Sequence, residues 1–141
     1  MVLTSTPDPA DGSSCTLVFE EHNNWLRAIW KGFVDNAEAV RGADIYLETS
    51  QKFPCAYLLN DNTRIEGPWF DSVEWLQRVW APKAAQLGLR YVAHVTPDHR
   101  DELAAVQQHD AFKDLFEVQF FKNLIDAEDW LRSCQEVHEW R

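Results

Sequence analysis

The segment Cys55-Ala56-Tyr57-Leu58-Leu59 is a continuous apolar run of strand length. Because none of its side chains is charged, neither side of a strand formed here suits water, and the run predicts a central strand covered on both faces of a sheet. Polar residues 60–68 follow at once, and this composition is typical of a connecting loop. We expect that loop to open at the carboxyl edge of the sheet, where α/β proteins bind ligands.

Upstream of this run, the sequence predicts a β-hairpin and a helix. Two β-prone runs, residues 17–21 and 25–30, flank the short turn His22-Asn23-Asn24. Apolar residues then recur at spacings of three and four, which predicts a helix that begins at Asp35 and ends before Pro54. Its stripe consists of Ala37, Val40, Ala43 and Leu47, with Tyr46 beside it.

Downstream, helical and strand patterns alternate. A helix is predicted from Asp71 to Gly88, bent at Pro82, followed by a strand at 91–95 and a helix that starts at Thr96-Pro97. A strand at 115–121 and a last helix capped by Asn123 complete the pattern. The stripe of the last helix is Ala127, Leu131 and Cys134.

The resulting order, ββαβαβαβα, predicts a single α/β domain over residues 15–135. It has a five-stranded, mostly parallel sheet with an N-terminal hairpin and helices on its faces. Residues 1–14, with two prolines and several small polar residues, are expected to be a disordered N-terminal segment, and residues 136–141 a C-terminal tail.

Charge and composition exclude several functions. The 141 residues include 13 basic and 23 acidic side chains, a formal charge of -10, which disfavours binding to nucleic acid or anionic membranes. No apolar run is long enough to span a bilayer, and the first 14 residues lack the features of a secretory signal. The three cysteines form no closely spaced pair, so we expect free thiols and a cytoplasmic location.

Several segments resemble the small bacterial STAS/SEC14-like proteins of the SpoIIAA-like fold. They are residues 87–93, the segment from Phe120 to Leu131, Trp30-Lys31-Gly32-Phe33, and the helix that contains Trp80-Ala81-Pro82. The resemblance spans residues 16–134 and implies a five-stranded mixed sheet with helices on its faces. It implies no single activity, since the fold includes both anti-sigma-factor antagonists and SEC14-like lipid binders.

The resemblance also points to a phosphorylation site. In the anti-sigma-factor antagonists a serine is phosphorylated near the junction of the third strand and the following long helix, which corresponds to residues 60–72 here. Ser72 and Thr63 are the candidates. The family's Asp-Ser-Ser-Gly signature is replaced by Asp71-Ser72-Val73-Glu74, which weighs against such a switch.

The polar connection after the central strand is the candidate ligand site. Polar side chains and one aromatic wall would line it: Asp61, Thr63, Arg64, Glu66 and Trp69. The alternative is a solvated loop that merely leads into the next helix.

The seven tryptophans suggest either a large aromatic core or a contact surface. Trp69, Trp75 and Val79 would form an apolar patch on a second stripe of the helix that begins at Asp71. Since tryptophan is enriched at the centres of protein interfaces, we expect a homodimer or a protein-partner contact there.

No catalytic signature is present in the sequence. The five histidines lack metal-binding spacing, and the five isolated glycines form no phosphate loop, so we expect no metal, no cofactor and no enzymatic activity. The preferred hypothesis is a non-enzymatic regulatory or protein-interaction module. The alternatives are a binder of a small apolar ligand or lipid, with a pocket near residues 61–69, and an enzyme whose site has no recognisable motif.

Overall fold

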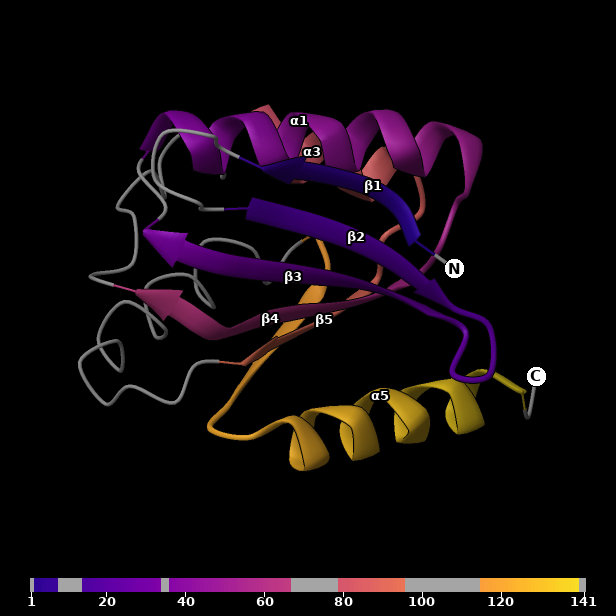
Figure 1. Cartoon of the computed structure of the whole chain (residues 1–141). Coiled ribbons are helices and arrows are strands. Elements are labelled where there is room, and N and C mark those ends of the chain that lie inside the picture. Colours follow the sequence, from indigo (N-terminus) through magenta and orange to yellow (C-terminus); the bar gives the residue numbers. More distant parts are fainter. Residues whose placement is uncertain (1, 8–13, 34–35, 67–78, 96–114, 140–141) are drawn as a thin grey trace.

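The computed structural model describes residues 2–7, 14–33, 36–66, 79–95 and 115–139. These residues form one six-stranded sheet between two layers of helix (Figure 1). Helices α1 (Asn36–Lys52) and α3 (Ala81–Gln86) cover one face, and α5 (Leu124–Glu139) covers the other (Figure 1). The strands are β1 (Val2–Pro7), β2 (Ser14–Glu20), β3 (Trp25–Phe33), β4 (Tyr57–Glu66), β5 (Tyr91–Val95) and β6 (Glu117–Phe121).

The strands follow one another across the sheet in chain order. β1, β2 and β3 pair antiparallel, whereas β3, β4, β5 and β6 pair parallel. The predicted α/β class is confirmed, with the hairpin at its N-terminal side and parallel crossovers beyond it. The carboxyl ends of β3, β4 and β5 therefore meet at one edge of the sheet.

Strand β4 lies at the centre, as its apolar composition predicted. Tyr57, Leu58 and Leu59 are all buried. Leu58 belongs to the core beneath α1 and α3, while Tyr57 and Leu59 belong to the core beneath α5. Successive side chains of the strand thus point into two separate cores, and the apolar face of a helix packs against each core.

Three predicted boundaries were wrong. β4 does not end at Leu59 but continues to Glu66, so the expected polar loop is largely strand, because β3 extends to Phe33 and pairs with it. Residues Val2–Pro7, expected to be disordered, form β1 on the free edge of β2. The last helix runs to Glu139 and includes most of the expected tail.

The helix predictions that can be compared are confirmed. In α5, Asn123 caps the first turn by accepting from the Asp126 amide at 2.9 Å, and Ala127, Leu131 and Cys134 are buried. Gly88 adopts a φ of 111° just after α3, the left-handed conformation typical of a helix C-terminus. Pro82 lies in the first turn of α3, where its missing amide is tolerated. The predicted helical segments 71–78 and 96–108 lie outside the described residues.

Helix α1 meets the sheet closely at a glycine. The indole ring of Trp30 on β3 packs under Gly42, and a Cβ atom at residue 42 would lie 2.5 Å from Cη2 of Trp30. The glycine therefore serves close packing rather than helix formation, for which alanine is the better residue.

We expect Gly42→Ala to destabilise the protein by about 1–3 kcal/mol, because the methyl group overpacks the Trp30 ring. On helix propensity alone the same change would stabilise the protein by about 1 kcal/mol. The sign of the change in the free energy of unfolding therefore distinguishes the packing effect from the propensity effect. Urea unfolding measures the difference. Asp44→Ala, at an exposed position of the same helix, is the control, and a Gly42→Ala protein more stable than the parent would contradict the packing argument.

Candidate functional site

The polar half of β4 lies at the carboxyl edge of the parallel strands. From Asn60 onward its side chains alternate between the two faces of the sheet, as the apolar ones do before it. Asn60 and Asn62 contact His94 of β5 on the face covered by α1 and α3. Asp61 approaches Arg27 of β3 on the face covered by α5. The edge therefore carries two polar clusters, one on each face.

The first cluster is a chain of neutral hydrogen-bonding groups. Nε1 of Trp30 donates to Oδ1 of Asn60 at 2.7 Å, and the amide nitrogen of Asn60 lies 3.1 Å from Nδ1 of His94. On the other side of the ring, the amide nitrogen of Asn62 lies 3.2 Å from Nε2. Phe120 of β6 packs against the imidazole at a centroid distance of 5.1 Å.

Two carboxamides contact the ring of His94, one at each nitrogen. Because the carboxamide oxygen of Asn60 accepts from Trp30, its NH2 group faces His94, and Nδ1 of the ring must accept. A neutral imidazole accepts at only one nitrogen, so Nδ1 and Nε2 cannot both accept from the amide nitrogens of Asn60 and Asn62. Burial lowers the pKa of His94 to about 4, so the side chain is neutral at physiological pH.

The second cluster surrounds Arg27, whose side chain is only 12% exposed. Its guanidinium donates to Glu20 at 2.9 Å and to Glu128 of α5 at 2.7 Å, and its Nη1 lies 3.9 Å from Asp61. Burial alone would lower the pKa of Arg27, but the hydrogen bonds to Glu128 and Glu20 outweigh it and raise that pKa. The cluster thereby ties the hairpin, the central strand and α5 together.

Asp61 also shapes the end of β4. Its Oδ1 accepts from the backbone amide of Thr63 at 3.0 Å and from the Thr63 hydroxyl at 2.7 Å. Beyond it the register with β3 changes: Ile29 pairs with Asp61, but Lys31 pairs with Arg64. Three residues of β4 thus oppose two of β3, which is a β-bulge.

The structure separates the predicted ligand-binding residues. Asp61 is buried and Thr63 is half-buried, and they bond to each other, whereas Arg64 is exposed. Glu66 is the last residue of β4, opposite Phe33. Trp69, the predicted aromatic wall, lies outside the described residues, as do Ser72 and Trp75. Val79, the remaining residue of the predicted interface, is half-buried just before α3.

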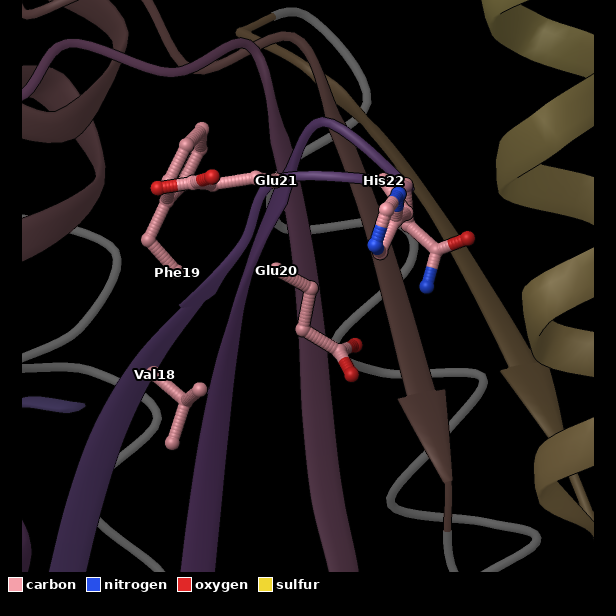
Figure 2. A pocket seen from close by; sticks show the side chains of 6 residues that line it. Val18, Phe19, Glu20, Glu21 and His22 are labelled. Carbon is pink, nitrogen blue, oxygen red and sulfur yellow. The ribbon is translucent and has the colours of Figure 1, made fainter. Parts of the chain in front are cut away.

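A depression of about 410 Å³ lies elsewhere, at the turn between β2 and β3. It is lined by Val18, Phe19, Glu20, Glu21, His22 and Asn23. Figure 2 shows that the labelled side chains point in different directions and do not converge on one point. Glu20 is already bonded to Arg27 and to the indole of Trp25. We therefore interpret the depression as a surface hollow beside the turn rather than as a binding site.

The remaining reactive groups are also accounted for within the described part of the chain. Its three cysteines are free thiols, and burial raises the pKa of Cys15 to about 12 and that of Cys134 to about 11. No cluster of three acidic, histidine or cysteine side chains suited to a metal ion occurs among the residues with described positions. Over the same residues, no helix has the length and apolar character that a membrane crossing requires.

Comparison with known proteins places the fold. No model of a protein family matches the sequence, and no curated protein matches it. A solved structure does resemble the chain: an uncharacterized protein of the DUF3478 family with a SpoIIAA-like fold, from Shewanella loihica PV-4. The two share 18% identity and superpose with a TM-score of 0.53, over 89% of this chain and 98% of the other. The chain therefore has a SpoIIAA-like fold, as its sequence predicted.

Sequence reasoning missed most residues of both polar clusters. Trp30 is a buried core residue, and no sequence pattern predicted its hydrogen bond to Asn60. Arg27 and Glu128 are 101 residues apart, and no local pattern relates them. One signal was available: Arg27 lies in the middle of a predicted strand with a tryptophan two residues away, and a buried charge of that kind requires a partner.

His94 should make stability depend on pH in a defined window. Its pKa is about 4 in the folded chain, below the ordinary value of 6.5, so the unfolded chain binds a proton that the folded chain does not. Stability is therefore greatest above pH 6.5 and falls as the pH drops toward 4, by up to about 1.4 kcal/mol per pH unit.

Urea unfolding of the parent and of His94→Gln between pH 7 and pH 5 measures this contribution. We expect the variant to lose stability less steeply over that range, whatever its absolute stability. His22→Gln, in the exposed turn, is the matched control and should keep the parent's slope. Parallel slopes for the parent and His94→Gln would contradict a buried neutral imidazole.

Arg27→Met should destabilise the chain by about 3 kcal/mol, because it leaves Glu20 and Glu128 close together without their cation. The loss should shrink toward pH 4, where carboxylates become protonated. Arg132→Met is the control: Arg132 is 48% exposed and also pairs with Glu128, so it should cost about 1 kcal/mol or less. Equal losses for the two variants would mean that Arg27 has no special role.

Proposed function

We propose that the chain is a non-enzymatic regulatory or protein-interaction module with a SpoIIAA-like fold. The observation that carries the proposal is the state of His94, the titratable side chain at the carboxyl edge on the α1 and α3 side. It is buried between two carboxamides and has a pKa of about 4. A general acid or base works best with a pKa near the operating pH and within reach of substrate.

The neighbouring acidic group supports the same conclusion. Asp61 is buried, accepts two hydrogen bonds from Thr63 and lies beside Arg27. Its hydrogen bonds serve to hold the end of β4 in place. Both clusters thus act as a rigid frame for the sheet edge, which suits a module that presents a surface rather than one that turns over a substrate.

A cytoplasmic location and a partner contact through Trp69, Trp75 and Val79 belong to this proposal. The free thiols support the first, since thiols persist in reducing compartments. The half-buried position of Val79 beside α3 supports the second, because the residue retains apolar surface for a partner or a second copy of the chain.

A second candidate, a small-ligand binding domain, is favoured by a single observation. Arg64 is exposed at the carboxyl end of the central strand, whereas the polar side chains before it are engaged within the protein. Ligands of open α/β sheets bind at that edge.

Val79→Asp tests the interaction proposal. We expect it to remove the partner that co-purifies with the tagged parent from its native cells, or to convert a homodimer into a monomer in sedimentation experiments. Ile125→Asp, at a position 71% exposed on α5, is the matched control and should retain the complex. Loss of the complex in both variants, or in neither, would contradict a contact at Val79.

Measurement of substrate turnover tests the proposal that the chain is not an enzyme. If the purified chain turns over a substrate, and His94→Gln abolishes that turnover while keeping the parent's far-UV spectrum and unfolding cooperativity, the proposal fails.

A further inference from the structure

Two basic residues face each other at the carboxyl edge. Lys31 on β3 and Arg64 on β4 are register partners on neighbouring parallel strands, and both are exposed. Directly opposed residues of adjacent strands point to the same side of a sheet, and like charges in such a pair repel each other. An anion bound between these two cations would relieve their repulsion.

The pairing results from the bulge. Without the register change, Lys31 would oppose Thr63, and Arg64 would point to the other face. The Asp61 side chain prevents this by holding the amide and hydroxyl of Thr63, which inserts one extra residue into β4. Bulges often re-aim a side chain beside a functional site, and here the side chain that is re-aimed is that of Arg64.

The carboxylate that builds the bulge does not neutralise the basic pair. Asp61 is buried, its Oδ1 is occupied by Thr63 and its Oδ2 lies toward Arg27 at 3.9 Å. The ion pairs between side chains that the structure describes involve Arg27 and Arg132 and not Lys31 or Arg64. Gly32, which follows Lys31 with a φ of 82°, adds a second local distortion of β3 at the same place.

We propose that Lys31 and Arg64 form a binding site for a phosphate-type oxyanion. The guanidinium offers a planar fork of N–H donors that matches two oxygens of such a group, and the ammonium supplies a compact second charge. Two cations balance a doubly charged phosphate monoester better than a singly charged carboxylate. The site deepens the small-ligand candidate above and is independent of the contact proposed at Val79.

The phosphate group has two possible sources with the same chemistry. It can belong to a free phosphorylated ligand, or it can be carried by Thr63, the residue that precedes Arg64. The second source requires that Thr63 release Asp61, because its hydroxyl donates to that carboxylate. Mass spectrometry of the chain from its native cells separates them: fragmentation that places an added phosphate on Thr63 identifies the internal source, and an unmodified chain that binds phosphate in solution identifies the external one.

Titration of the full chain with inorganic phosphate and with phenyl phosphate, followed by amide NMR, tests the site. We expect saturable shifts centred on the amides of residues 31–33 and 63–66, and a much weaker response to acetate at the same ionic strength. Shifts spread evenly over all basic residues, or an equal response to acetate, would overturn the proposal.

Single variants test the two cations. Lys31→Gln and Arg64→Gln should each weaken phosphate binding at least about tenfold, the loss expected for a charge-assisted hydrogen bond. Lys83→Gln removes an exposed cation on α3 and should leave the affinity unchanged. If Lys83→Gln weakens binding as much, or if neither edge variant weakens it, the site is absent.

The urea midpoints of the parent and of Lys31→Gln, measured with and without phosphate, test the site in a second way. A nonspecific charge effect would not reverse their order. Without phosphate, Lys31→Gln should raise the urea midpoint, since it relieves repulsion from Arg64. With phosphate well above the parent's Kd, the order of the urea midpoints should reverse, because the parent binds the anion more tightly and gains more stability from it. An unchanged order would overturn the proposal. Val79→Asp should bind phosphate like the parent, so a failure of this site and a failure of the partner contact are distinguishable.

Discussion

Strand β4 is bonded to a neighbour on each edge and covered on both faces, so polar side chains in its buried part must find partners inside the protein. Its first half meets this constraint with apolar residues, which divide between two cores. Its second half meets it with paired groups: Asn60 and Asn62 with His94, and Asp61 with Thr63 and Arg27. Up to Leu59 the side chains of β4 are apolar and form part of the two cores. After Leu59 they are polar and paired with other groups, and this part of the strand supports the carboxyl edge of the sheet.

The architecture could be predicted from local patterns because each buried stripe repeats at the spacing of its element. The run at residues 55–59, the stripe on α1 and the stripe on α5 all led to the correct layers. The extension of β4 could not be predicted in the same way. Asn and Asp favour loops locally, and pairing with β3, about 30 residues earlier, keeps residues 60–66 extended, with β5 pairing to Asn60 and Asp61 as well.

The candidate site was predicted only in part, for a related physical reason. The polar residues after Leu59 do lie at the carboxyl edge of the parallel strands, and Arg64 is exposed there; that a ligand binds at this edge stays a prediction. The loop model nevertheless treated Asp61, Thr63 and Arg64 as equivalent lining residues, whereas a strand with a bulge gives each a different environment. Lys31 was not predicted as part of the site, since its relation to Arg64 depends on a register change that no single segment encodes.

Strand β1 has a practical consequence for handling the protein. It occupies the outer edge of β2, and its composition of threonine, serine and a terminal proline suits an edge that must not recruit another chain. Removing it, or displacing it with a bulky N-terminal fusion, would uncover the backbone donors and acceptors of β2 and invite edge-to-edge aggregation. Purification tags therefore belong after α5, which packs on a face of the sheet and adds no strand to its edges (Figure 1).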